Sequence, residues 1–164
     1  MIATDQFRAA MARFPGAVTI VTARSSEGER RGITATAVCS VTADPPSVLV
    51  CLNVATGTCA AVEATGRFAV NLLSETQTGL ALRFAGQAGV SGTDKFAEGD
   101  WEAEDDLPIL RDAPVTLACE VSQSLSAGTH RIFIGRITGI AHGEGAALLY
   151  EQSRFRSLAA KDSA

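Results

Sequence analysis

Residues 32–46 read Gly-Ile-Thr-Ala-Thr-Ala-Val-Cys-Ser-Val-Thr-Ala-Asp-Pro-Pro. With a period of two, one face of a strand would carry Ile33, Ala35, Ala37, Cys39 and Val41, and the other Thr34, Thr36, Val38 and Ser40. One face then packs into a core, while the other presents a row of small hydroxyls. The pattern predicts a single strand that borders a ligand groove. The alternative is a sheet face whose β-favouring threonines simply meet water.

Composition excludes several classes of protein. The 164 residues suit one domain, 1–164, with 46% hydrophobic and 20% charged residues. The net charge of −4 argues against a nucleic-acid partner, and no apolar run reaches the length of a membrane span. The first residues lack the features of a secretory signal. Four cysteines without metal or redox spacing predict a reduced, cytoplasmic protein with no metal site: Cys39, Cys51, Cys59 and Cys119.

Strand patterns dominate the rest of the chain. A helix is expected over 4–14, capped by Thr4 or Asp5, with an apolar stripe formed by Phe7, Ala10, Met11 and Phe14. Further strands are expected at 18–23, 47–52, 67–73, 115–124 and 130–141, and further helices at 56–64 and 74–84. Segments 85–99 and 98–106 are expected to be loops, the second acidic and solvated. This order predicts a mainly β fold: a closed or nearly closed barrel with two or three helices.

Three segments are candidates for chemistry. The turn at residues 53–58 precedes a helix, where free N–H groups and the hydroxyls of Thr56 and Thr58 suit a phosphate, although Thr56 or Thr58 serves equally as a helix cap. Arg83 lies at the end of the next helix. Its guanidinium is suited either to bind a phosphate or to interact favourably with the negative end of the helix dipole. His130 follows a glycine turn at a strand start, a position typical of a ligand contact or of an ordinary polar residue.

Several known chemistries have no motif here. No Gly-x-Gly-x-x-Gly follows a strand, so a nicotinamide nucleotide would not be held by a Rossmann unit. Walker, Gly-x-Ser-x-Gly and His-Glu-x-x-His motifs are also absent from the sequence.

In their order along the chain, these segments resemble the flavin reductase family, the NADH-dependent small components of two-component flavin monooxygenases. The resemblance runs from Phe7 to Leu158. It is carried by 7–22, 32–46, Phe-Ala-Val-Asn-Leu-Leu-Ser-Glu-x-Gln (68–77), Leu-Ala-Leu-Arg-Phe-Ala-Gly (80–86), Lys95-Phe96, Gly128-Thr-His130 and Leu148-Leu-Tyr150. It implies an FMN-binding split β-barrel, a closed barrel with a Greek-key-like path.

The resemblance also implies roles for individual residues. The flavin ring and ribityl chain are expected along Thr34, Ala35, Thr36, Ala37, Ser40 and Val41, with further contacts from Cys51, Leu52 and Asn53. The phosphate is expected near Thr56 and Thr58, with Arg83 and Phe84 close by. His130 is expected near the nicotinamide, and Tyr150 and Phe155 are the candidates for an aromatic that closes the site. Thr129 stands where the family usually has aspartate, and Phe155 where tyrosine is common.

The function implied is hydride transfer from NADH, or NADPH, to FMN or FAD, which supplies reduced flavin to a separate monooxygenase. NADH is favoured over NADPH because no arginine cluster for a 2′-phosphate stands out in the sequence. The resemblance also implies a homodimer. Two alternatives remain: a barrel that binds or stores flavin without turnover, and a reductase of another acceptor through bound flavin.

Overall fold

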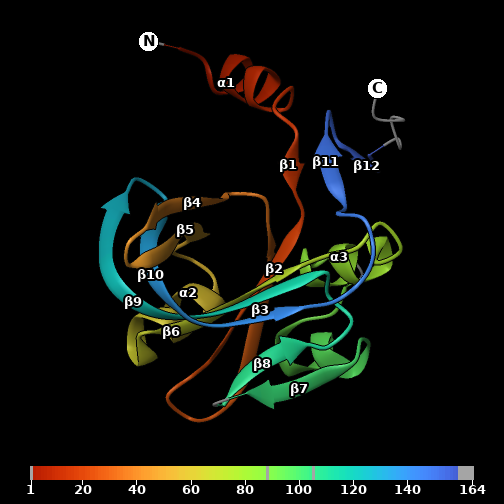
Figure 1. Cartoon of the computed structure of the whole chain (residues 1–164). Coiled ribbons are helices and arrows are strands. Elements are labelled where there is room, and N and C mark those ends of the chain that lie inside the picture. Colours follow the sequence, from red (N-terminus) through yellow and green to blue (C-terminus); the bar gives the residue numbers. More distant parts are fainter. Residues whose placement is uncertain (1, 88, 105, 159–164) are drawn as a thin grey trace.

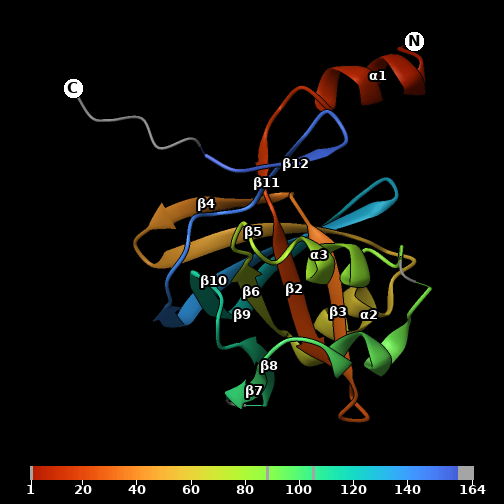
Figure 2. The ribbon, with the colours of Figure 1, turned by 90° about the vertical axis from the view of Figure 1, so that its right-hand side faces the viewer.

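The computed structural model describes residues 2–87, 89–104 and 106–158. Its centre is an antiparallel sheet of seven strands in the order β3-β2-β6-β9-β10-β5-β4 (Figure 1). These strands are β2 (Thr19–Arg24), β3 (Arg30–Ala35), β4 (Val38–Ala43), β5 (Pro46–Asn53), β6 (Arg67–Leu72), β9 (Val115–Ala127) and β10 (His130–His142). Helices α2 (Gly57–Thr65) and α3 (Thr78–Phe84) and the 3-10 segment η1 (Gly92–Ala97) pack beside β2 and β3 (Figure 2).

The prediction of one strand over residues 32–46 is wrong. The run forms two strands, β3 and β4, separated at Thr36 and Ala37, and they lie at opposite edges of the sheet. The reason lies in the backbone bonds, because the N–H of Val38 turns back to the carbonyl of Thr36 (3.0 Å) and the carbonyl of Ala37 accepts from Cys51 on β5 (3.1 Å). The chain therefore leaves one edge of the sheet and joins the other.

The mainly β class is confirmed, and among the described residues three α-helices accompany the strands. The closed barrel is not confirmed. Within the described part of the chain no hydrogen-bonded ladder joins β3 to β4, so the sheet curves but keeps two edges. Most predicted elements lie within a residue or two of the observed ones. The helix expected from residue 74 begins instead at Thr78, although the N–H of Ser74 donates to Oε1 of Gln77 (2.9 Å), which is one of the two hydrogen bonds of a capping box.

The acidic segment is partly a strand. Residues 101–104 form β7 (Trp101–Glu104), which pairs with β8 (Leu107–Leu110). Asp105, part of the predicted loop, lies outside the described residues. The side chains of β8 are buried, and the Trp101 ring lies 5.2 Å from that of Phe84 and 4.9 Å from that of Phe96. Apolar burial thus draws this segment into a hairpin, while Glu102 and Glu104 stay exposed.

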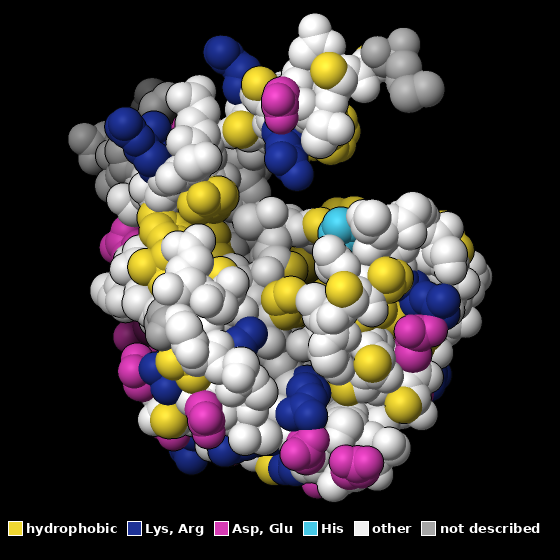
Figure 3. All heavy atoms as spheres, turned by 180° about the vertical axis from the view of Figure 1, so that it is seen from behind, with side chains coloured by type: hydrophobic (Ala, Val, Ile, Leu, Met, Phe, Trp, Pro, Cys, Tyr) yellow, Lys and Arg dark blue, Asp and Glu magenta, His cyan; other side chains and the backbone are white. Residues whose placement is uncertain are grey.

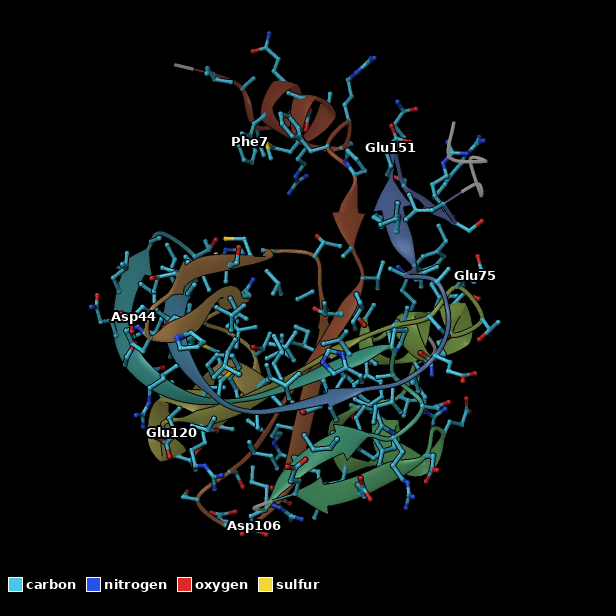
Figure 4. The ribbon with its side chains drawn as sticks, viewed as in Figure 1. Phe7, Asp44, Glu75, Asp106, Glu120 and Glu151 are labelled. Atoms are coloured by element: carbon cyan, nitrogen blue, oxygen red, sulfur yellow. The ribbon has the colours of Figure 1, made fainter. Side chains whose placement is uncertain are left out.

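The N-terminal helix stands away from the body of the molecule. Helix α1 (Thr4–Met11) is shorter than predicted, and its N-cap is Ala3 rather than Thr4 or Asp5. The chain leaves it through β1 (Gly16–Ala17), which forms a small sheet with β11 (Leu149–Glu151) and β12 (Arg154–Arg156). No residue of α1 is buried, and Figure 4 shows Phe7 projecting away from β11.

Among the residues described, no helix combines the length and apolar character needed to cross a membrane.

Candidate functional site

Two cavities lie in sequence along the edge strand β3. The first, here called the aromatic cavity, has a volume of about 310 Å³, and its lining includes Thr34, Ala35, Thr36, Ala81, Leu82, Gln87, Tyr150 and Phe155. The second, the basic cavity, has a volume of about 260 Å³ and is lined by Arg31, Gly32, Ile33, Thr56, Gly57, Thr58, Gly92 and Lys95. Residues 31–33 line the basic cavity, and the next three residues along the chain, 34–36, line the aromatic cavity. Because three residues of a strand span about 10 Å, the two cavities lie side by side along β3.

The aromatic cavity is formed by α3 on one side and by the hairpin of β11 and β12 on the other. Tyr150 and Phe155 face each other in this hairpin, with ring centroids 5.3 Å apart and planes at 62°. The hairpin is anchored to the N-terminal segment, because the N–H of Gln152 donates to the carbonyl of Ala12 (2.7 Å). Seen from behind, hydrophobic side chains gather beside a hollow in this part of the surface (Figure 3). The cavity suits a flat apolar ring with a few polar edges.

The threonine hydroxyls of β3 serve the fold as well as the cavity. Thr34 Oγ1 donates to the carbonyl of Ala81 on α3 (2.6 Å), which holds the helix against the strand. Its lone pairs remain available to a ligand donor. Thr36 is exposed where the chain passes from β3 to β4. The row of hydroxyls is therefore only partly free for binding.

The basic cavity is built around the start of α2. Thr56 caps this helix, as one alternative predicted, since its hydroxyl accepts from the N–H of Cys59 (3.2 Å). Thr58 is buried in the first turn. The side chain of Arg31 lies across Gly57, where an added Cβ would stand 3.3 Å from its Cδ and Nε atoms. A helix N-terminus beside a guanidinium is a favourable seat for an anion.

Lys95 reaches the basic cavity from η1. Its ammonium donates to the carbonyls of Phe84 (3.0 Å) and Gly32 (3.4 Å). Burial lowers the pKa of Lys95, because a charged ammonium loses hydration there. Neither Lys95 nor Arg31 was expected as a site residue. Lys95 belongs to the Lys95-Phe96 pair of the resemblance and Arg31 directly precedes the hydroxyl-rich run, but only the packing of η1 on β3 brings them together.

Arg83 and Phe84 lie behind the basic cavity and line neither of the two. Phe84 is fully buried, and its ring lies 5.0 Å from that of Phe96. The guanidinium of Arg83 donates to the carbonyls of Lys95 (2.9 Å) and Asp94 (2.7 Å) and to Glu98 Oε1 (2.7 Å). Both side chains therefore hold η1 against α3.

The remaining predicted residues of β4 and β5 lie toward the other edge of the sheet. Ser40 lines a third, mostly apolar cavity of about 310 Å³, Val41 and Ala37 are exposed, and Leu52 is buried in the core.

Burial raises the pKa of the Cys51 thiol, and neighbouring Cys39 raises that pKa further. Cys51 is therefore a neutral thiol at neutral pH.

His130 and Asn53 lie directly opposite each other where β10 begins and β5 ends. His130 is exposed, and its Nδ1 is 3.0 Å from the hydroxyl of Thr129. Oδ1 of Asn53 accepts from the N–H of Ala55 (2.9 Å) and shapes the turn into α2. The hydroxyl of Thr129 thus contacts the imidazole where the family usually has an aspartate. This pair lies outside the lining of the aromatic and basic cavities.

Comparison with known proteins gives consistent results. The "Flavin reductase like domain" family matches residues 11–159. The chain is 39% identical over 160 residues to "FMN reductase (NADH) RutF" of Ancylobacter novellus, covering 96% of this chain and 87% of the relative. It is 40% identical over 150 residues to "4-nitrophenol 4-monooxygenase/4-nitrocatechol 2-monooxygenase, reductase component" of Rhodococcus opacus, covering 92% and 78%.

Solved structures agree with these relatives. "Flavin reductase PheA2 in native state" superposes with a TM-score of 0.88 at 31% identity, covering 97% of this chain and 100% of that one. BorF, described as "the Flavin Reductase Component of a Bacterial Two-Component Tryptophan Halogenase", superposes with a TM-score of 0.87 at 26% identity, covering 97% and 100%.

Proposed function

This chain belongs to the flavin reductase family, and we propose that it transfers hydride from NADH to FMN or FAD and supplies reduced flavin to a separate monooxygenase. One observation carries the proposal most directly. A cavity for a flat ring and a cavity for an anion adjoin along β3, as a flavin with its phosphate requires. Relatives named FMN reductase (NADH) and reductase components of monooxygenases support the donor, the acceptor and the partner.

The residues present fit a flavin nucleotide. Apolar and aromatic side chains of the aromatic cavity would exclude water from a bound ring, and the hydroxyl of Thr34, which lines the cavity, would accept a hydrogen bond from a polar group of that ring. Two cations, the start of α2 and the hydroxyl of Thr58 suit a phosphate. Bound flavin would supply the redox chemistry by accepting a hydride. The chain itself orients the reactants, keeps water out and provides donors for developing negative charge, none of which needs a side-chain nucleophile.

We further propose that His130 positions the nicotinamide. It is exposed beside the turn at Asn53, and the contact with Thr129 restrains its ring. His130→Ala should raise the KM for NADH by about tenfold, the loss of one good hydrogen bond, with little change in the Kd for FMN. Steady-state kinetics and flavin fluorescence measure the two constants separately.

His142 provides a matched control, because it is an exposed histidine at the other end of β10. His142→Ala should leave both constants unchanged. A parallel loss of FMN affinity in His130→Ala would count against the assignment.

The catalytic proposal is tested by mixing purified protein with NADH or NADPH and, in turn, FMN, FAD and riboflavin. Oxidation of the nicotinamide only when a flavin is present is the expected result. A yellow protein that consumes no nicotinamide would instead be a flavin-storing barrel. If bound flavin is reduced but passes its electrons to a metal complex and not to free flavin or oxygen, the reductase serves another acceptor.

We also infer a homodimer in which α1 and the segment directly after it, which includes Phe14, pack against a second copy. Phe7 and Phe14 are 60% and 67% exposed, and burying a large apolar side chain contributes about 1.5–3 kcal/mol. The paired change Phe7→Glu and Phe14→Glu is expected to yield monomers in analytical ultracentrifugation. Gln6→Glu, a polar change on the same helix, should leave the assembly intact. A wild-type monomer at micromolar concentration would refute the inference.

A cytoplasmic location is part of the same proposal. It is supported by the four cysteines, which are all free thiols, including the exposed Cys39.

A further inference from the structure

The turn between β9 and β10 carries His130 at the tip of a long two-stranded ribbon. Both strands have 13 residues, and Ala127 pairs with His130 across a turn of two residues. Gly128, the first of these two, has a φ of +59°, as in a type II′ hairpin turn. In Figure 2 the tip of the ribbon projects from the sheet, so few contacts are available to hold it in place.

The backbone of Thr129 supplies one of those contacts. Its carbonyl accepts from the N–H of Val54 (3.1 Å), which lies in the turn between β5 and α2. Beside it, His130 pairs with Asn53, whose Oδ1 accepts from the N–H of Ala55 (2.9 Å) in the same turn. The tip of the ribbon is therefore tied to the start of α2, and the backbone of residue 130 has a defined place.

The side chain of Thr129 orients the imidazole of His130. Its hydroxyl lies 3.0 Å from Nδ1 and makes no other hydrogen bond to the residues that the structure describes. A hydroxyl can donate to a ring nitrogen or accept from one, whereas a carboxylate can only accept. The aspartate usual in the family would thus require Nδ1–H and leave Nε2 of a neutral ring as an acceptor. Threonine permits the opposite tautomer, in which Nε2 carries the proton.

We infer that Thr129 is a positioning residue: its hydroxyl donates to Nδ1 of His130, so that Nε2–H of the neutral ring donates to the carboxamide oxygen of the nicotinamide. The inference rests on the proposed function. The carboxamide lies next to the reacting carbon, C4, so one hydrogen bond to its oxygen fixes the rotation of the ring. A neutral donor also adds no charge beside a ring that becomes positive when hydride leaves.

Nitrogen-15 NMR of tag-free protein measures the tautomer directly. The chain has two histidines, so His142→Ala leaves the imidazole of His130 as the only signal. In alkaline buffer, where histidine is neutral, the proton should lie on Nε2. Thr129→Val should return the ring to the mixture of tautomers found in free histidine, and Thr129→Asp should move the proton to Nδ1.

Steady-state kinetics test the consequence for NADH. Thr129→Val should raise the KM for NADH about three- to tenfold, the worth of one neutral hydrogen bond, and leave the Kd for FMN unchanged. Thr129→Ser keeps the hydroxyl and should retain the wild-type KM. In a His130→Ala background Thr129→Val should add nothing, because the hydroxyl acts only through the ring. Thr129→Ala repeats the test if the valine variant fails to fold.

Thr138 provides a matched control on the same strand. Its hydroxyl bonds the carbonyl of Ala118 (3.2 Å), far along β10 from the turn. Thr138→Val removes a hydroxyl of the same kind and should leave the KM for NADH unchanged.

Thio-NADH probes the acceptor of the proposed bond, because sulfur replaces the carboxamide oxygen and accepts more weakly. The wild type should have a higher KM for thio-NADH than for NADH. The ratio of the two KM values should be smaller in Thr129→Val and smallest in His130→Ala. The same ratio in all three proteins would show that the imidazole does not meet the carboxamide, and would overturn that part of the inference.

The other outcomes separate the inference from the function. A proton on Nδ1 in the wild type, an unchanged KM in Thr129→Val, or additive losses in the double variant would overturn the role of Thr129 while the wild type still oxidised NADH. A raised KM in Thr129→Ser would show that the hydroxyl is not what matters. If the wild type oxidises no NADH with any flavin, the proposed function fails and the contact with nicotinamide fails with it, whereas the NMR result still decides the bond between Thr129 and His130.

Discussion

Asn71→Ala is expected to lower the free energy of unfolding by about 3–5 kcal/mol. Asn71 is fully buried on β6, where its Oδ1 accepts from the N–H of Leu110 (2.9 Å) and its Nδ2 donates to the carbonyl of Ile20 (3.0 Å) and the hydroxyl of Thr22 (3.2 Å). One amide therefore joins β2, β6 and β8. Its removal takes one hydrogen-bond partner from the N–H of Leu110, the carbonyl of Ile20 and the hydroxyl of Thr22. A buried polar group left unsatisfied costs about 1–3 kcal/mol, and the lost side-chain volume adds a small cavity.

Urea unfolding followed by circular dichroism measures this loss. Such a loss is a large share of the stability of an ordinary domain, about 5–15 kcal/mol. Ser122→Ala is the control, because the Ser122 hydroxyl makes one exposed bond to the carbonyl of Ile134 (3.0 Å) and should cost less than about 1 kcal/mol. A loss at Asn71 no larger than that at Ser122 would show that the amide does not tie the β7–β8 hairpin to the sheet.

Gly32→Val is expected to impair both cavities at once. An added Cβ at Gly32 would lie 2.6 Å and 2.8 Å from ring atoms of Phe84 and 3.2 Å from Phe96. The aromatic cluster that holds α3 and η1 against β3 must then shift. Overpacking of this kind costs about 1–3 kcal/mol, and displacement of Lys95 and of the carbonyl of Ala81 should weaken FMN binding at least tenfold.

Flavin titration and thermal unfolding of the same variant test the two effects together. Gly79 is the matched control, since it lies in α3 and a Cβ there would meet no atom within 4 Å. Gly79→Ala should bind FMN normally and gain up to about 1 kcal/mol of stability through helix propensity. Unchanged FMN affinity in Gly32→Val would mean that the position of η1 does not govern the site.

Much of the secondary structure was predictable because its signals are local. The α2 helix was expected from its cap and observed with Thr56 in that role, and the buried run at 47–52 forms most of β5. The hydroxyl-rich run misled the prediction at its centre. Alternation of small residues is compatible with a continuous strand, and nothing in the local pattern shows that the strand is interrupted at Thr36 and Ala37.

The candidate site was predictable in outline only. Thr34, Ala35 and Thr36 do share a cavity with Tyr150 and Phe155, and Thr56 shares another with Thr58. Arg31 and Lys95 were missed, since they are far apart in the chain and meet only through the packing of η1 on β3. Arg83 was chosen for its charge, yet the structure uses that charge on carbonyls and one carboxylate.

By itself, the sequence determined the mainly β class, the positions of most elements and the family to which the chain belongs. Caps, alternating patterns and turn residues act between near neighbours, so they can be read along the chain. Only the tertiary structure decided that β3 and β4 lie at opposite edges, which threonines share a cavity, and which cations face it. A guanidinium can pair with any acceptor that packing brings within reach, and that packing depends on contacts between segments distant in sequence.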